Sequence, residues 1–230
     1  MLATRARMAA GAGGGGSAQY ALTFNATSSL VDCGNNSSLN NLPASAVTLE
    51  YWIRPQSAGE ANLGKPFHKQ HITSWLTSSN QIVFRVSSDG GNSTATAVAA
   101  WATNTWVHVA HTYDNGGDRK ARTYINGSLS ATAPTACAGT IRDDSSYNLI
   151  FGNDPTAVRT IDGDMSWFRL SDNIRYSGPF TPAAKDAPPA SDGNTVEQWN
   201  LNDGSGATAA AEESTPTNDG AITDGSWTEL

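Results

Sequence analysis

The sequence predicts an all-β protein built from many short strands. Ser, Thr, Asn, Ala and Gly are abundant and only 15% of the residues are charged, a composition typical of short strands joined by polar turns. No segment shows a sustained helical period of apolar residues, so almost no helix is expected. Seven segments have the length and apolar content of strands: Tyr20–Phe24, Leu30–Cys33, Val47–Arg54, Trp106–Tyr113, Arg122–Leu129, Asn148–Gly152 and Met165–Leu170.

Two signals in the middle of the chain depend on local chemistry alone. Residues 81–86 alternate and then meet a turn-forming cluster at residues 89–92. The segment 124–129 contains Asn126-Gly127, a pair that supplies the two positive φ angles of a type I′ turn. We therefore expect a hairpin that closes at these two residues.

The segment 106–113 predicts a strand that is buried on both faces. Val107 and Val109 fall on one face, while the other face carries Trp and Ala side chains together with His108. His111 is separated from His108 by an odd number of positions. The two imidazoles should therefore point to opposite faces of the strand.

The chain divides by composition into four parts. Residues 1–19 include the run Gly13–Gly16 and predict an arm that is flexible or is ordered by a neighbouring subunit. Residues 20–178 contain the strand segments and form the main β domain. Residues 179–195 are a Pro- and Ala-rich connection that cannot lie inside a sheet. Residues 196–230 are too few to bury their own core, so they are expected to pack on the main domain as a β appendage.

Charge and hydropathy disfavour two classes of partner. The formal net charge is −7 and the pI is near 4.9, which disfavours nucleic acid because phosphate binding needs a basic stripe. The longest apolar runs have the length of strands, so no membrane partner or membrane-spanning helix is expected. Arg5 and Arg7 are not followed by the continuous apolar stretch of a secretory signal.

Cys33 and Cys137 are the two cysteines of the chain. No C-x-x-C pair indicates a zinc or redox site. A disulfide between them would close a loop of roughly 100 residues and contribute about 4 to 5 kcal/mol to stability in the chain-entropy model. Two half-buried thiols are the favoured interpretation, and the disulfide stays open as the alternative.

Eight phrases occur in a fixed order along the chain: Ala21–Asn25, Leu30–Gly34, Thr48–Pro55, Trp106–Asp114, Tyr124–Gly127, Leu149–Gly152, Gly163–Leu170 and Gln198–Gly206. In this order they resemble the laminin-G-like and pentraxin-like domains of the concanavalin A-type lectin/glucanase superfamily. The resemblance covers residues 20–230. It implies a two-sheet antiparallel jelly-roll sandwich, with residues 20–178 as the laminin-G-like part. The fold implied in this way usually binds rather than catalyses, although one fold hosts many functions.

The resemblance also implies where calcium would bind, if it binds at all. Asp154, with Asn153 beside it, and Asp162 stand where pentraxin-like domains hold their ligands. Ca²⁺ needs about six or more oxygen ligands, and this chain departs from the usual pattern at three places: residues 25–27, residues 70–71 and Ser166. The sequence leaves two possibilities, no cofactor or a weak Ca²⁺ site.

Candidate catalytic groups are missing from the sequence. Retaining glycoside hydrolysis needs two carboxyl groups roughly 5 Å apart, and the Glu-x-Asp-x-Glu phrase of hydrolases with this fold is absent. Glu50 lies on a predicted strand with no acidic partner beside it. His68, His71 and the two histidines of segment 106–113 lack the third ligand and general base of a zinc hydrolase. We expect no enzymatic activity.

Tryptophans are the best pointers to a glycan surface, because an indole ring can pack on an apolar face while its N–H donates a hydrogen bond. Trp52, Trp106 and Trp167 lie in core-like strand phrases and are expected to pack. Trp75 and Trp101 are the candidates for contact with a glycan or a protein partner.

Two functions remain open after these exclusions. The narrowly favoured one is a non-enzymatic structural, decoration or attachment module of a large assembly, in particular the surface of a bacteriophage virion, with protein neighbours in a homo-oligomer. Its support is the arm, the acidic and charge-poor composition and the missing catalytic carboxylates. The alternative is a carbohydrate-binding lectin or adhesin, extracellular or on a cell surface, which is Ca²⁺-dependent if the residues near Asp154 hold metal.

Overall fold

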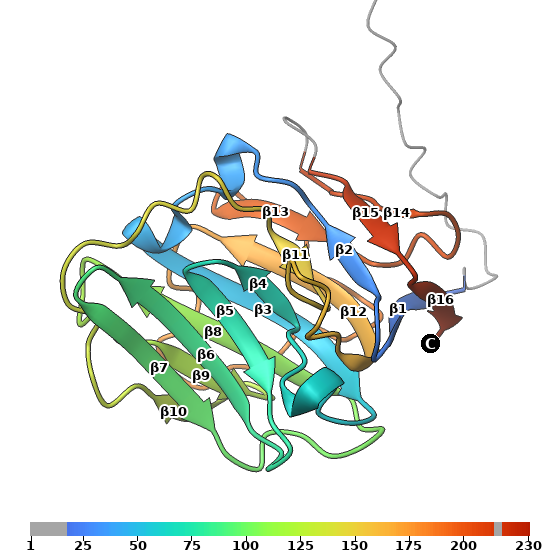
Figure 1. Ribbon diagram of the computed structural model, residues 1–230, viewed down its shortest axis with the longest axis horizontal. Helices are drawn as coiled ribbons and strands as arrows, with labels where there is room; N and C mark the ends of the chain where they lie inside the picture. Colours follow the sequence, from blue (N-terminus) through green and yellow to red (C-terminus); the bar gives the residue numbers. More distant parts are fainter. Residues whose placement is uncertain (1–17, 214–217) are drawn as a thin grey trace, which may run out of the picture.

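The computed structural model describes residues 18–213 and 218–230 as two antiparallel sheets of eight strands each, stacked as layers (Figure 1). The first sheet is called sheet A. Its strands run in the order β10 (Ser128–Thr132), β9 (Arg122–Ile125), β8 (Val107–Asp114), β3 (Ala46–Pro55), β12 (Asp162–Ser171), β1 (Tyr20–Asn25) and β16 (Ser226–Glu229), and β13 (Thr195–Trp199) pairs with β12.

The second sheet, sheet B, lies on the other side of the core. Its strands run in the order β14 (Thr208–Ala209), β15 (Gly220–Thr223), β2 (Leu30–Asp32), β11 (Ile150–Phe151), β4 (Phe67–Lys69), β5 (Ile72–Leu76), β6 (Ile82–Ser88) and β7 (Gly91–Ala97). The predicted all-β, two-sheet antiparallel fold is therefore confirmed. Helix is limited, in the described ranges, to three short 3₁₀ segments: η1 (Ser37–Leu39), η2 (Leu42–Ala44) and η3 (Glu60–Asn62).

The core between the sheets is built from alternate residues of each strand. Phe168 of β12 lies at its centre, with its ring centroid 5.7 Å from that of Tyr51, 5.9 Å from that of Phe67 and 4.4 Å from that of Phe151. The rings come from four different strands of both sheets, and each is buried. Burial of such large apolar side chains is the main free-energy gain that holds the two layers together.

The predicted turn between β9 and β10 and the predicted orientations of two histidines are both present. Asn126 and Gly127 join β9 to β10 with φ angles of 48° and 80°, so the predicted hairpin is confirmed. His108 and His111 of β8 also point to opposite faces. His111 stacks on Phe84 in the core, whereas His108 meets Trp52 on the outside of sheet A.

The C-terminal strands extend both sheets. β13 and β16 join sheet A, while β14 and β15 join sheet B. Trp199 of β13 is fully buried, and its indole N–H donates to the carbonyl oxygen of Asn218 at 2.8 Å. The boundary between a main domain and an appendage stays a prediction, but these strands share the core of the sandwich.

Residues 176–190, which include most of the Pro- and Ala-rich connection, cross the outer face of sheet A. We call this segment the strap. Backbone carbonyls of the strap accept hydrogen bonds from side chains of the sheet beneath. The indole N–H of Trp52 donates to Ala183 at 2.9 Å, and that of Trp167 donates to Ala184 at 3.0 Å. The strap therefore lies over Trp52 and Trp167 on this face.

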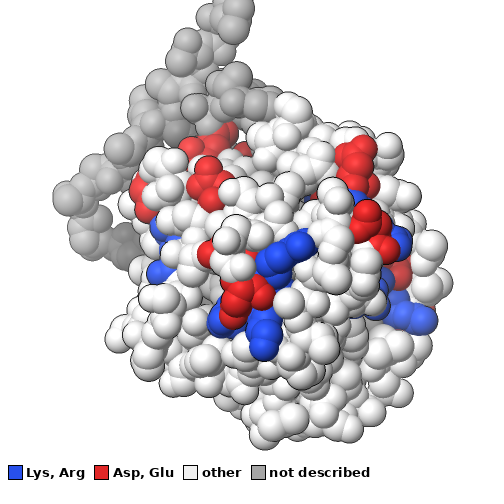
Figure 2. Space-filling view, turned by 90° about the vertical axis from the view of Figure 1, so that its left-hand side faces the viewer, with Lys and Arg blue, Asp and Glu red and all other residues white. Residues whose placement is uncertain are grey.

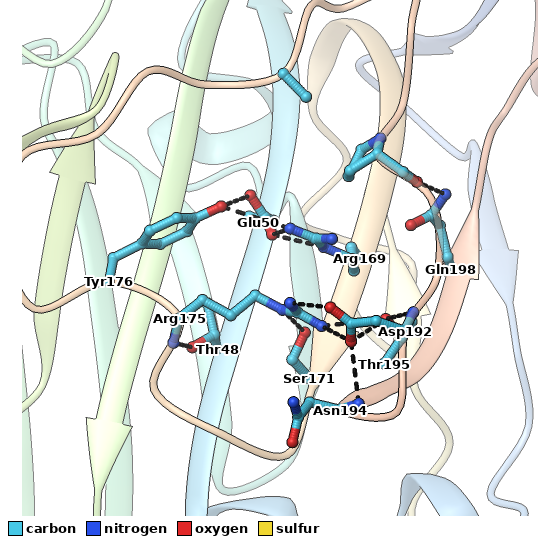
Figure 3. A network of polar contacts seen from close by, with 12 residues as sticks. Thr48, Glu50, Arg169, Ser171, Arg175, Tyr176, Asp192, Asn194, Thr195 and Gln198 are labelled. Atoms are coloured by element: carbon cyan, nitrogen blue, oxygen red, sulfur yellow. Dashed lines mark hydrogen bonds and ion pairs between the residues drawn. The ribbon is translucent and has the colours of Figure 1, made fainter.

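Two ion pairs anchor the chain around the strap (Figure 3). The buried guanidinium of Arg169 donates to Glu50 through Nε at 2.7 Å, and the hydroxyl of Tyr176 donates to the same carboxylate at 2.7 Å. Arg175 forms a two-point contact with Asp192, at 2.8 and 2.7 Å. The Tyr176–Glu50 contact links the strap to β3, and the Arg175–Asp192 pair joins the two chain segments that flank the strap.

Two further expectations concern the cysteines and membrane association. Cys33 and Cys137 are free and buried, and burial raises the pKa of the Cys33 thiol well above its usual value. This is the arrangement that the sequence favoured. No helix within residues 18–213 and 218–230 has the length and apolar character needed to cross a membrane.

Candidate functional site

The outward face of sheet B carries a tryptophan and an arginine in contact. In β5, Ser74 points inward, where its hydroxyl lies 3.1 Å from Nε2 of His111, so Trp75 points outward and is half-buried. In β6, Phe84 belongs to the core and Arg85 faces out. The guanidinium carbon of Arg85 lies 5.3 Å from the centroid of the Trp75 ring, which is within the range of a cation–π contact.

A shallow cavity of about 220 Å³ opens beside this pair. Leu63, Lys65, Thr73 and Arg159 complete its lining, so an indole ring, an apolar side chain and several cations meet at one place. We call these six residues, including Trp75 and Arg85, the Trp75 surface. Such a mixture of an aromatic platform with a few polar groups is typical of small-molecule and sugar sites.

A second hollow of about 480 Å³ adjoins the first, because Arg85 lines both. Its walls are residues 87–92 of the β6–β7 hairpin, Gln70 and His71 of the turn between β4 and β5, and Arg142. We call it the arginine hollow. We call the two cavities, which share Arg85, the depression; Trp75 lines the first cavity and Arg142 lines the second.

Cations of this depression differ in whether they are neutralised. Nζ of Lys65 lies 3.1 Å from Oδ2 of Asp154, whereas within residues 18–213 and 218–230 no ion pair involves Arg85, Arg142 or Arg159. On the face shown in Figure 2, charged side chains form a few groups on a mostly uncharged surface. These three arginines thus have no ion-pair partner in the described ranges, in a chain of formal net charge −7.

His68 lies beside the Trp75 surface as a neutral group. Its Nδ1 is 3.2 Å from the hydroxyl oxygen of Thr73 and 3.4 Å from Nζ of Lys65. Burial, and then the charge of Lys65, lower the pKa of His68 from 6.5 to about 4. At neutral pH the positive charge of this region comes from lysine and arginine.

The residues predicted to bind calcium are committed to other contacts. The side-chain amide of Asn153 donates to the carbonyl oxygen of Ser29 and to the hydroxyl of Thr160, at 3.2 and 2.6 Å. Its Oδ1 accepts from the backbone N–H groups of Asp154 and Arg159, at 2.8 and 2.9 Å. Asn153 therefore fixes the loop that follows β11.

Asp154 is neutralised by protein groups. Its carboxylate accepts hydrogen bonds from Thr156 and Lys65. These outweigh burial, which alone raises the pKa of Asp154, and the net effect is a lowered pKa. Asp162 begins β12 and pairs with Asn25 of β1. No group of three or more His, Cys, Asp or Glu residues in the described ranges is placed to hold a metal. The ammonium of Lys65, 3.1 Å from Asp154, would compete with any cation there, and Ca²⁺ binding at these residues stays a prediction.

The two tryptophans proposed from the sequence have different environments. Trp101 is only 7% exposed, belongs to the core, and donates its indole N–H to the carbonyl oxygen of Gln81 at 3.3 Å. Its ring offers no free face, and Trp75 is the one of the pair that remains available. Sequence reasoning missed Arg85, although the alternation of residues 81–86 places it on the same outward face as Trp75.

Residues 16–176 match the Laminin_G_3 family model, described as the concanavalin A-like lectin/glucanases superfamily. The chain belongs to this superfamily. The resemblance carried by the eight sequence phrases is thereby confirmed, since this laminin-G-like match spans more than half of the 230 residues. No curated protein matches the chain.

Solved structures share the superfamily fold at low identity. A "putative carbohydrate binding protein" from Bacteroides ovatus is 17% identical with a TM-score of 0.68, and the match covers 93% of this chain and 60% of that one. Domains LG4-5 of the mouse laminin α1 chain are 18% identical with a TM-score of 0.50, covering 91% and 56%. A heptameric SAP-like pentraxin from Limulus polyphemus is 16% identical with a TM-score of 0.48, covering 76% and 93%. The chain thus spans less than two thirds of the first and second of these proteins.

Proposed function

We propose that this protein is a lectin-like module that binds carbohydrate at the Trp75 surface. The observation that carries the proposal is the half-buried Trp75 ring, fixed by Arg85 at 5.3 Å and bordered by a cavity of about 220 Å³. An indole held in place loses little conformational freedom when a sugar ring packs on it. The name of the Bacteroides ovatus protein, which refers to carbohydrate binding, agrees with this proposal.

The positions of two buried glutamates support binding without hydrolysis. Glu50 is 1% exposed and is held by Arg169 and Tyr176 beneath the strap. Glu197 is also buried and accepts hydrogen bonds from the backbone N–H groups of Gln198 and Glu213. Neither carboxylate lies beside the Trp75 surface. We therefore infer a binding module rather than a glycosidase.

The virion role is a separate proposal with different support. It rests on the arm of residues 1–19, of which residues 1–17 lie outside the described part of the chain. Assembly into a homo-oligomer or a virion stays a prediction, as does calcium dependence. Glycan attachment at a virion, cell-surface or extracellular location is compatible with one module, because each needs an exposed Trp75 surface.

A glycan-array screen followed by calorimetry tests the proposal. Trp75→Ala should weaken saccharide binding about tenfold or more, since loss of an aromatic contact worth about 1.4 kcal/mol has that effect. Trp106→Ala is the matched control, because Arg54 lies over the Trp106 ring at the same 5.3 Å. Equal affinity of the Trp75 variant and the unmodified chain would contradict the proposal, as would an equal loss in the Trp106 variant.

A further inference from the structure

Arg85 is the first of two arginines that lack a partner of their own. Its Nε is buried, yet it has no hydrogen-bond acceptor in the described structure. The Trp75 ring is the contact that holds the guanidinium in place. A buried N–H donor without an acceptor costs about 1 to 3 kcal/mol. The guanidinium of Arg85 therefore has unmet hydrogen-bonding capacity, and Arg85 lines both cavities.

Arg142 also lines the arginine hollow. It is exposed, and its backbone is positioned by the bridge between Ile141 and Ser88. The loop is fixed further by Asp89, whose Oδ1 accepts from the backbone N–H of Thr140 at 2.6 Å. Asp89 is the acidic side chain in the lining, and this contact engages one of its oxygens. Arg85 and Arg142 thus line the same hollow from separate, ordered segments.

The remaining lining groups are neutral. Burial, and then the charge of Arg142, lower the pKa of His71, so its imidazole is uncharged at neutral pH. Gln70, Ser87 and Asn92 add amide and hydroxyl groups to the walls. The hollow therefore combines two cations, one carboxylate and several neutral hydrogen-bonding groups.

We infer that the arginine hollow binds the carboxylate of an acidic sugar, while the Trp75 surface holds the neighbouring part of the same saccharide. This inference rests on the proposed function and names the ligand class. The planar guanidinium forms two parallel hydrogen bonds to a carboxylate, which makes arginine the suited residue for such recognition. Arg85 joins the two cavities, so stacking and charge recognition act on one ligand.

The probe is a matched pair of saccharides: short oligogalacturonates and the same oligomers with their carboxylates methyl-esterified. In calorimetric titrations of the full chain, the acidic form should bind about tenfold more tightly than the ester. The difference should shrink as NaCl is raised, because salt screens exposed charges. Sulfated dextran oligosaccharides test whether sulfate can replace the carboxylate, and polyglutamate tests whether the sugar is needed.

Arg142→Gln is the decisive variant, because Arg142 is exposed and makes no contact with Trp75 in the described structure. It should lower the affinity for the acidic form toward that of the ester and leave the affinity for the ester unchanged. Arg85→Gln should have the same effect on the acidic form and also weaken the ester, since it removes the support of the indole. Lys185→Gln, which removes one positive charge from the strap, is the control and should leave both affinities unchanged.

The possible results separate this inference from the proposed function. Equal affinity for acid and ester, with both weakened by Trp75→Ala, would overturn the inference and support carbohydrate binding. Preference for the acid that survives Arg142→Gln, or equally strong binding of polyglutamate or sulfated dextran, would also overturn it. Failure of every saccharide on the array, neutral ones included, would overturn both.

Discussion

At the residue scale, the most constrained group is the imidazole of His111 between the two sheets. Its ring nitrogens lie 3.2 Å from the hydroxyl of Tyr51, 3.1 Å from that of Ser74 and 3.0 Å from that of Thr123. Phe84 stacks on the ring with a centroid distance of 4.5 Å. Burial, and to a smaller degree His108, lower the pKa of His111 from 6.5 to about 3. The neutral imidazole thus links side chains of both sheets.

We expect this histidine to make the fold sensitive to acid. The unfolded chain binds a proton near pH 6.5 and the folded chain does not until about pH 3, so the stabilisation is fully present above pH 6.5. It should fall as the pH decreases from 6.5 toward 3, by about 1.4 kcal/mol per pH unit at most. Urea unfolding at several pH values measures the slope. His111→Gln should be less stable at pH 7.5 but decline less steeply, and equal slopes would contradict the assignment.

At the scale of elements, the strap is held on the outer face of sheet A by hydrogen bonds and ring stacking. Besides the two indole donors, Nε2 of Gln198 donates to the carbonyl oxygen of Pro189 at 2.9 Å. Phe180 stacks on Tyr176 with a centroid distance of 3.5 Å. The backbone N–H of Phe180 also donates to the carbonyl oxygen of Gly127 at 2.9 Å. The β9–β10 turn and the strap therefore depend on each other.

The close approach at Gly127 gives a test of this dependence. A Cβ atom there would lie 1.8 Å from the carbonyl oxygen of Phe180, and the φ angle is 80°. Gly127→Ala should therefore displace the strap and cost more than the roughly 1 kcal/mol expected from a left-handed φ alone. Gly34→Ala is the matched control, because its φ is 69° with no atom within 4 Å. Equal losses in urea unfolding, with unchanged hydrogen exchange at Phe180, would contradict the dependence.

At the scale of the whole molecule, the chain ends contribute to one cooperative core. β1 lies between β12 and β16, and β2 lies between β11 and β15. Trp199 packs against Phe151 and Phe168 with centroid distances of 4.8 and 6.0 Å. The C-terminal strands thus contact the centre of the sandwich.

Loss of the Trp199 side chain should therefore destabilise the entire fold. Trp199→Ala is expected to cost about 3 to 5 kcal/mol, as for other large buried aromatics, and to leave a single unfolding transition. Trp227→Ala is the comparison, because this half-buried indole packs only at the margin of the core and should cost clearly less. Circular dichroism in urea measures both. Separate transitions for the tail and the remaining sandwich would show that they are independent units.

The strands and turns that depend on local sequence were predicted correctly. Strand phrases and the Asn126-Gly127 turn follow from alternation and from backbone preference, and both are present in the structure. Contacts between residues far apart in the chain could not be predicted from local sequence patterns. Trp75 and Trp101 are alike in sequence, yet only Trp101 is taken into the core. The Lys65–Asp154 ion pair joins residues 89 positions apart, so the neutralisation of the expected calcium ligand had no local signal.

The strap has a further consequence for how strongly such a module can attach. The strap lies over the outer face of sheet A, and the one sugar-binding region proposed within the described residues lies on sheet B, so we expect each copy to contribute a single contact. Tight attachment to a surface that displays many identical glycans then depends on the number of linked copies rather than on each contact. Linking two such copies turns the second encounter into an intramolecular one, at an effective concentration in the millimolar range for short flexible linkers. Avidity would therefore be set by whatever holds the copies together.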